Sequence, residues 1–223
     1  MPFILHIETA TTVCSVAVSL NRELLALKET NTGYTHAENL HVFIQEVLKE
    51  ASVKPSQLSA IVVSKGPGSY TGLRIGVSAA KGLAYALSVP LISVDTLQSM
   101  AYHVSLKTPG LTYVPMLDAR RMEVYCGVYN RALQLLEPVN AHILGGSSAS
   151  VFAPYSPLCF FGDGMPKAKA LLSHIPGAVF SENVFPSAAD MISLAFEKYE
   201  KQAFEDVAYF EPFYLKEFML GAR

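Results

Sequence analysis

The chain has 223 residues, of which 51% are hydrophobic and 16% are charged, and its formal net charge is −2. This composition is typical of a globular chain with one or two domains, and it excludes a disordered protein. The small negative charge argues against a protein that binds nucleic acid by itself, because such proteins present a strongly basic face.

The first half of the chain predicts three strands followed by alternating helices and strands. The strands are expected at Ile4–Glu8, Val13–Leu20 and Glu23–Glu29, with a hairpin turn at Asn21-Arg22 between the last two. An amphipathic helix follows, and its apolar positions are Leu40, Phe43, Ile44, Val47, Leu48 and Ala51. The remaining elements are a strand, a helix and a strand that leads into a further helical stretch, at Ile61–Val63, Gly72–Leu87 and Leu91–Val94.

The same order then repeats in the second half. Strands are expected at Leu111–Leu117, Met122–Tyr129, Ala132–Glu137, Leu158–Phe161 and Ala178–Phe180. Helical stretches are expected near Ala149, at Lys167–Ser173 and from Ala188 to about Ala203. Each half reads βββαβαβα, so we expect an N-terminal ATPase-like half (residues 1–108) and a smaller ATPase-like half with a returning tail (109–223). This α/β layout of two mixed-sheet halves is that of the actin, sugar-kinase and chaperone ATPase (ASKHA) superfamily.

The first hairpin is one place where that superfamily holds phosphate, with a pattern similar to D-x-G-T-T. This chain has Glu8-Thr9-Ala10-Thr11-Thr12 there. The Cβ of Ala10 obstructs the close backbone approach that glycine permits, and Glu8 is one methylene longer than aspartate. A structural relic is therefore favoured over a vestigial nucleotide site made of Glu8, Thr11, Thr12 and Asp118.

A second candidate is the stretch GPGSYTGLRIG, from Gly66 to Gly76, which lies between a predicted strand and a predicted helix. It is not a P-loop, because Leu73-Arg74 stands where lysine followed by serine or threonine is needed. Helix capping by Ser69 or Thr71 and a tight turn are favoured over phosphate binding.

The helix after this loop has an unusual stripe of small residues: Gly72, Gly76, Ala80 and Ala84 recur at intervals of four. Glycine inside a helix costs ~1 kcal/mol relative to alanine, so a stripe that contains glycine needs a reason. Close approach of another helix is the reason that fits. A helix of the same chain and a helix of a second subunit are equally good candidates.

Other residue types give little sign of catalysis. His36 and His41 are five residues apart, which is about 140° around a helix, so their rings do not share a face and no metal site is expected. There is no G-x-S-x-G motif.

The three cysteines, Cys14, Cys126 and Cys159, fit thiols in a reducing cytoplasm. The segment from Asp118 to Glu123 could position a ligand, but a turn with paired surface charges is favoured. The start MPFILHIETAT resembles no signal peptide, and no apolar run is long enough to span a membrane.

Several stretches form a recognisable set: ILHIETATTVCSVAV, HAENL, SKGPGSYTGLRIGVSAAKGLAYAL, LDARRMEVYCGVY and EPFYLKE. They resemble the bacterial TsaB (YeaZ) family over nearly the whole chain. The resemblance implies a cytoplasmic, non-catalytic paralogue of TsaD, which transfers a threonylcarbamoyl group to the adenosine 3′ of the anticodon in tRNAs reading codons that begin with A. TsaD carries a metal-binding H-x-x-x-H that TsaB-like chains lack, and the glycoprotease label of some members comes from that paralogue. The family usually has aspartate where Glu8 stands.

The resemblance also implies the partners. They are a TsaD-like catalytic subunit, a TsaE-like ATPase and tRNA reached only through the complex, with a homodimer when the chain is alone and no cofactor, metal or membrane. We predict a scaffold rather than an enzyme, docking through the helices Ala37–Ala51 and Gly72–Leu87. The predicted contact residues are Leu40, Ile44, Leu48, Gly72, Gly76, Ala80 and Ala84. The alternatives are a degenerate nucleotide-binding hydrolase or kinase that uses Glu8, Thr11 and Asp118, and a less favoured metallopeptidase.

Overall fold

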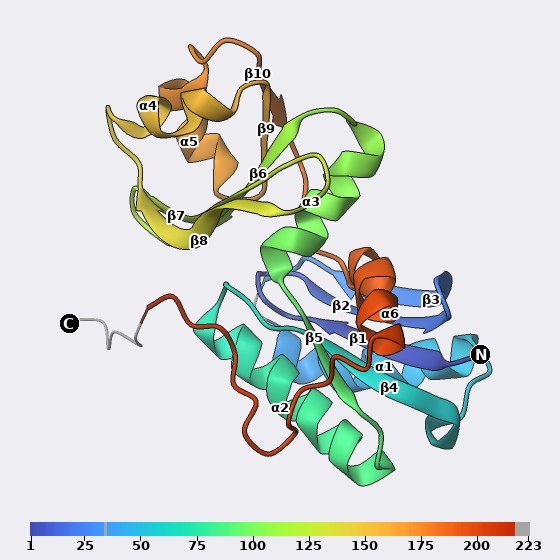
Figure 1. Cartoon of the computed structure of the whole chain (residues 1–223). Coiled ribbons are helices and arrows are strands. Elements are labelled where there is room, and N and C mark those ends of the chain that lie inside the picture. Colours follow the sequence, from blue (N-terminus) through green and yellow to red (C-terminus); the bar gives the residue numbers. More distant parts are fainter. Residues whose placement is uncertain (34, 217–223) are drawn as a thin grey trace, which may run out of the picture. The chain divides into compact units, whose positions relative to one another are not determined.

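The computed structural model describes residues 1–33 and 35–216 and contains two five-stranded sheets (Figure 1). The strand orders are β3-β2-β1-β4-β5 and β8-β7-β6-β9-β10, so the two sheets have the same topology. In each sheet the first three strands of the chain pair antiparallel, and the next two join in parallel. The predicted duplication with mixed sheets is confirmed.

The first compact unit consists of Met1–Ser99 together with Pro186–Phe213. Its strands are β1 (Phe3–Glu8), β2 (Cys14–Leu20), β3 (Glu23–Thr30), β4 (Leu58–Ser64) and β5 (Leu91–Val94). Its helices are α1 (His36–Glu50), the 3-10 turn η1 (Pro55–Gln57), α2 (Tyr70–Leu87), η3 (Ala188–Met191) and α6 (Ile192–Glu200). Helix α3 (Thr96–Lys107) begins in this unit and continues into the second.

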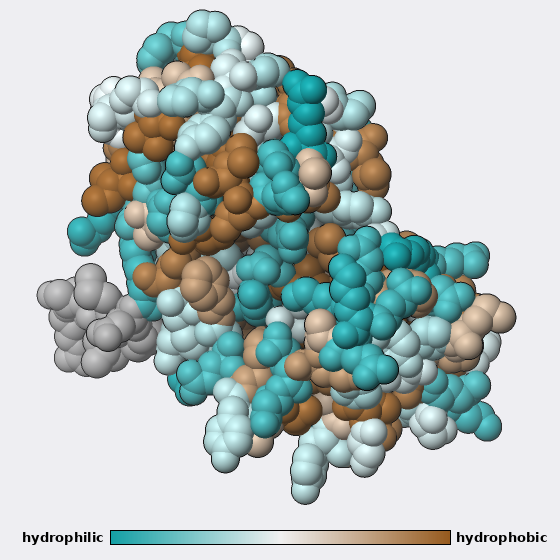
Figure 2. All heavy atoms as spheres, in the orientation of Figure 1, coloured by the Kyte–Doolittle hydropathy of each residue, from teal (hydrophilic) through white to brown (hydrophobic). Residues whose placement is uncertain are grey.

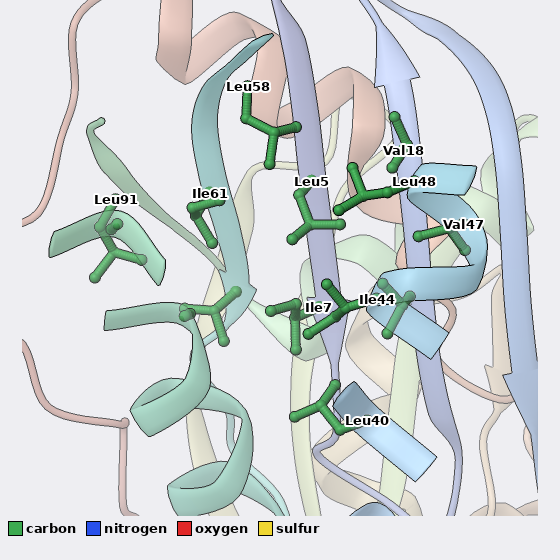
Figure 3. Packing of buried hydrophobic residues seen from close by; sticks show 14 of the residues in the cluster. Leu5, Ile7, Val18, Leu40, Ile44, Val47, Leu48, Leu58, Ile61 and Leu91 are labelled. Atoms are coloured by element: carbon green, nitrogen blue, oxygen red, sulfur yellow. The ribbon is translucent and has the colours of Figure 1, made fainter. Parts of the chain in front are cut away.

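Helices α1 and α2 pack on one face of the first sheet. Figure 3 shows Leu40, Ile44 and Leu48 of α1 pointing toward Leu5 and Ile7 of β1. Ala80 and Ala84 of α2 belong to the same buried cluster. Burial of these apolar side chains is the main favourable contribution to folding of the unit.

The opposite face of this sheet is covered by a segment from the far end of the sequence. Ala188, Met191 and Ala195 pack against Ile4 and Val62. The division at residues 108/109 is corrected accordingly, since Pro186–Phe213 belongs to the first unit. The physical reason is that the second apolar face of the sheet has to be buried, and η3 and α6 supply the apolar residues.

The returning tail is fixed to the first unit by backbone hydrogen bonds. Glu205 N donates to Leu91 O at 2.8 Å, and Phe213 N donates to Lys65 O at 2.7 Å. The Nζ of Lys81 on α2 donates to the carbonyls of Ala208 and Phe210, at 3.1 and 2.9 Å. The predicted tail therefore runs along β5 and α2, and Glu217 of its EPFYLKE motif lies outside the described residues.

The second unit consists of Met100–Phe185 with the residues from Tyr214. Its elements are β6 (Thr112–Asp118), β7 (Glu123–Tyr129), β8 (Leu135–Ile143), α4 (Ser148–Phe152), the 3-10 turn η2 (Ala153–Tyr155), β9 (Leu158–Phe161), α5 (Met165–Leu172) and β10 (Ala178–Ser181). The core of this unit lies between the sheet and α4 and α5, around Phe152, Phe160 and Met165. Among the residues that the structure describes, no helix is long and apolar enough to cross a bilayer.

Strand β8 differs from its predicted range of Ala132–Glu137. Asn130 Oδ1 accepts the N–H groups of Ala132 and Gln134, both at 2.9 Å, so these residues form the turn and the strand begins at Leu135. β8 is an edge strand with Leu135, Leu136 and Ile143 exposed, and Figure 2 shows hydrophobic side chains over β7 and β8.

Candidate functional site

The loop between β1 and β2 lies directly on the N-terminal half of α2. Thr9 Oγ1 donates to Gly72 O at 2.8 Å, and Ser69 N donates to Ala10 O at 2.6 Å. A Cβ at Gly68 would overlap the carbonyl oxygen of Ala10. The loop can therefore approach the segment that leads into α2 this closely only because position 68 is a glycine without a side chain.

The same close approach explains two more glycines. A Cβ at Gly72 would overlap the backbone oxygen of Thr9, and a Cβ at Gly76 would overlap its Oγ1. The element that approaches the small-residue stripe is thus a loop of the same chain. The sequence left a helix of this chain and a helix of a second subunit open. At Gly72 and Gly76 the nearest atoms belong to Thr9 of the loop, and at Gly72 the next nearest belong to His36, the first residue of α1.

Two N–H groups of the GPGSYTG segment, those of Ser69 and Gly72, are used within the fold. Ser69 N is bonded to Ala10 O, and Gly72 N donates to the Ser69 side chain at 3.3 Å, which caps the helix. A phosphate at a helix N-terminus needs such N–H groups for itself. The capping that the sequence favoured is therefore confirmed for Ser69.

Glu8, the acidic residue of the first hairpin, is wholly buried. Its Oε1 accepts the N–H of Ala10 at 2.5 Å, so the carboxyl bonds to its own loop. Burial raises the pKa of Glu8 to about 7, the bonds from Ala10 and Ser64 oppose this rise, and the charge of Asp190 adds to it. The carboxyl thus carries a proton for much of the time near neutral pH, unlike an aspartate that holds a magnesium nucleotide.

The other members of the predicted vestigial nucleotide site have local partners. Thr11 is buried, and its Oγ1 accepts Val13 N at 3.2 Å. Thr12 Oγ1 donates to Asn31 Oδ1 at 2.6 Å. Asp118 lies in the second unit at the end of β6, where Lys167 Nζ donates to it at 2.6 Å. Each polar group thus has a bond within its own unit.

The two histidines of α1 lie on different faces of the helix, as their spacing predicted. His36 is buried and its Nε2 lies 2.8 Å from Thr11 O, while His41 is exposed. Burial lowers the pKa of His36, and the bond to Thr11 opposes this. In residues 1–33 and 35–216, no group of three or more His, Cys, Asp or Glu side chains is arranged to hold a metal ion.

The seven predicted partner contacts all lie in the interior of the first unit: Leu40, Ile44, Leu48, Gly72, Gly76, Ala80 and Ala84. Buried positions offer little surface to a second protein in this conformation, so a direct contact of a partner with these seven residues stays a prediction. The physical reason is that both helices turn their most apolar and smallest residues toward their own sheet and loop.

The exposed side of α2 is the surface that sequence reasoning missed. It is formed by Arg74, Ser78, Gly82 and Tyr85, and we call it the outer face of α2. Tyr85 is 81% exposed, and nothing lies within 4 Å of a Cβ added at Gly82. The helical period could have identified this face, because these positions lie opposite the buried stripe.

Comparison with known proteins gives one family model and several relatives. The model, described as TsaD: tRNA N6-adenosine threonylcarbamoyltransferase, matches residues 30–204. The TsaB protein of Bacillus subtilis (strain 168), named a tRNA threonylcarbamoyladenosine biosynthesis protein, is 38% identical over 136 residues. That match covers 61% of this chain and 58% of the relative, so the chain spans little more than half of that protein's length.

Solved structures are similar over a longer part of the chain. YeaZ from Pseudomonas aeruginosa has a TM-score of 0.84 and 26% identity, covering 96% of this chain and 100% of that one. A polyphosphate/ATP-glucomannokinase from an Arthrobacter strain has a TM-score of 0.51 at 12% identity, covering 90% and 100% of the two chains. The likeness to this kinase is one of fold alone, and it confirms the predicted fold class.

Proposed function

Because the chain belongs to the TsaB (YeaZ) family, with a TsaD-type domain over residues 30–204, we propose that it is a non-catalytic subunit in the formation of threonylcarbamoyladenosine in tRNA. In this role it binds and activates a TsaD-like catalytic subunit, which modifies the adenosine 3′ of the anticodon in tRNAs reading codons that begin with A. A TsaE-like ATPase joins the assembly, and the chain contacts tRNA only as part of this assembly. The chain acts in the cytoplasm and forms a homodimer when alone.

One observation carries the non-catalytic assignment: the loop that holds phosphate in catalytic members of the fold is closed here. The carbonyl of Ala10 in this loop accepts a hydrogen bond from the N–H of Ser69, and the carboxyl of Glu8 has no exposed surface. A magnesium nucleotide could not reach that carboxyl without displacing the loop from α2. A hydrolase or kinase that uses Glu8 is therefore disfavoured.

The cysteines support the same assignment. Cys14, Cys126 and Cys159 are all buried and unpaired by disulfides. Burial raises the pKa of Cys14 to about 11, that of Cys126 to about 12 and that of Cys159 to about 11. A nucleophilic cysteine needs the opposite, a lowered pKa in a partly exposed setting.

The outer face of α2 is the docking surface that we propose for the TsaD-like subunit. Ser78 and Gly82 leave the helix backbone accessible, which permits a second helix to cross closely. Tyr85 next to them offers a large aromatic group of the kind that dominates binding energy at interfaces. Leu40, Ile44 and Leu48 fix the neighbouring helix α1 against the sheet.

Arginine at Gly82 is expected to weaken binding of the TsaD-like subunit at least tenfold while the chain stays folded. The side chain has open space in the free chain but would fill the gap that a crossing helix needs. Isothermal titration calorimetry with the purified catalytic subunit measures this. Gly82→Ala is the matched control and should bind like wild type. Wild-type affinity in Gly82→Arg would place the docking surface elsewhere. Ala80 is unsuitable for this test, since it is wholly buried and a larger residue there disturbs the core.

The function itself is tested by nucleoside mass spectrometry of bulk tRNA from cells depleted of the chain. Threonylcarbamoyladenosine should fall, recover with the wild-type chain and with Gly82→Ala, and stay low with Gly82→Arg. Unchanged modification after depletion would refute the proposal. Micromolar binding of Mg-ATP by the isolated chain, lost in Glu8→Ala, would favour the nucleotide-enzyme alternative instead.

A further inference from the structure

The hairpin turn between β6 and β7 has two adjacent arginines in a backbone conformation that arginine rarely adopts. Arg120 has a φ of 66° and Arg121 a φ of 48°. Glycine and asparagine adopt a positive φ much more readily than arginine does. A side chain with a Cβ is disfavoured there by its contact with the neighbouring carbonyl.

The backbone of this turn is fixed by hydrogen bonds from three places in the second unit: Asp118 at the end of β6, Lys167 on α5 and Leu144 after β8. Asp118 Oδ1 accepts Arg120 N at 2.7 Å and Lys167 Nζ at 2.6 Å. The same Nζ, from α5, donates to Arg121 O at 2.8 Å, and Leu144 N after β8 donates to Met122 O at 2.8 Å. These bonds explain how the strained turn is held. They involve only backbone atoms of the arginines, so they do not explain why arginine is present.

The two guanidinium groups project from this turn without an acidic partner. Both side chains are exposed, and across residues 1–33 and 35–216 neither forms an ion pair. The carboxylates nearby have their own cations: Lys167 pairs with Asp118, and Lys216 pairs with Glu123. The positive charges of Arg120 and Arg121 are therefore unpaired within the described residues, while the backbone that carries them is held by hydrogen bonds.

Arg22, in the turn between β2 and β3, gives a contrast within the same chain. Its guanidinium lies 3.5 Å from Glu197 and 3.4 Å from Glu200, so its charge is paired within the fold. The preceding residue of this turn, Asn21, has a φ of 53°, and asparagine tolerates the left-handed region. The turn at Asn21-Arg22 thus has a residue type suited to its backbone and a charge that is paired within the fold. The turn at Arg120-Arg121 has neither, and its arginine side chains make no stabilising contact among the described residues. A residue type that is unfavourable for the fold and makes no such contact indicates a binding role.

A planar guanidinium donates two parallel hydrogen bonds to a phosphate, and two adjacent ones fit neighbouring phosphates of a nucleic acid strand. Arg120-Arg121 is also the sole pair of adjacent basic residues in the sequence. We propose that this turn contacts the phosphate backbone of tRNA within the assembled complex, an inference that rests on the proposed function. A ribose–phosphate strand is favoured over an acidic protein segment because phosphate neutralisation supplies much of the affinity for RNA.

The test is a double variant, Arg120→Asn with Arg121→Gly, in the complete complex with its TsaD-like and TsaE-like subunits. Asparagine and glycine both tolerate a positive φ, so the charges are removed while the fold is retained. We expect KM for tRNA to rise about tenfold with kcat unchanged. The slope of log affinity for tRNA against log salt concentration should fall by about two, one for each phosphate contact.

Two further variants make the result specific. Arg120→Lys with Arg121→Lys keeps both charges and should keep most of the salt slope. Arg131→Gln, at an exposed arginine in the turn between β7 and β8, should change neither KM nor the slope.

The outcomes separate this inference from the function on which it rests. A wild-type complex that modifies tRNA, with an Asn-Gly variant of unchanged KM and salt slope, overturns the phosphate contact alone. A wild-type complex that leaves tRNA unmodified refutes the proposed function and this inference together. A variant that assembles more weakly but keeps the wild-type salt slope places the turn against a protein subunit, which also overturns the proposal.

Discussion

Alanine at Gly72 is expected to destabilise the chain by about 1–3 kcal/mol, as overpacking of a tight contact does. The added Cβ would overlap the backbone oxygen of Thr9, and a backbone atom cannot rotate away as a side chain can. The loop must then leave the helix, which breaks the 2.8 Å bond from Thr9 Oγ1 to Gly72 O and the 2.6 Å bond from Ser69 N to Ala10 O.

The matched control is the same substitution at Gly82 on the same helix. Nothing lies within 4 Å of a Cβ there, so only the better helix propensity of alanine remains. Gly82→Ala should therefore stabilise the chain by about 0.5–1 kcal/mol. Urea denaturation followed by far-UV circular dichroism measures both free energies of unfolding. Changes of the same sign in the two variants would contradict the close contact between loop and helix.

Glutamine at Glu8 is expected to remove a pH-dependent loss of stability. Burial raises the pKa of this carboxyl in the folded chain from its ordinary 4.5 to about 7, so the folded state binds the proton more tightly than the unfolded state. The stabilisation from the proton is full below pH 4.5 and is lost as the pH rises through about 7. The difference in pKa corresponds to about 3 kcal/mol between these limits. Glutamine keeps a carbonyl oxygen for Ala10 N and has no proton to lose.

The measurement is the difference in the free energy of unfolding between Glu8→Gln and wild type, taken from pH 4.5 to pH 8.5. A difference is needed because buried His6, whose pKa burial lowers to about 3, changes stability in the opposite direction over part of this range. The free energy of unfolding of Glu8→Gln should rise relative to that of wild type as the pH rises. Glu46→Gln, at an exposed glutamate of α1, is the control. Parallel curves for wild type and Glu8→Gln would show that the carboxyl is not buried as described.

The glycine stripe illustrates how far the sequence could be interpreted. The interval of four residues indicated a close approach on one side of a helix, and this is correct. The approaching element turned out to be the Thr9–Ala10 loop, because parallel pairing of β1 and β4 brings residues 9 and 72 together. No local pattern encodes that pairing. The same limit applies to the predicted docking residues, since a small-residue stripe looks alike whether it faces a subunit or its own chain.

By itself the sequence determined most of the strands and helices, the duplicated βββαβαβα order, the separation of His36 from His41 and the resemblance to a family. These depend on periodicity and residue type over a few positions, which local sequence contains. Only the tertiary structure decided that residues 186–213 return to the first sheet, that Glu8 is buried and that the outer face of α2 is exposed. Burial, pKa and exposed surface depend on groups that are distant in the chain, and these meet only when the two faces of a sheet are covered.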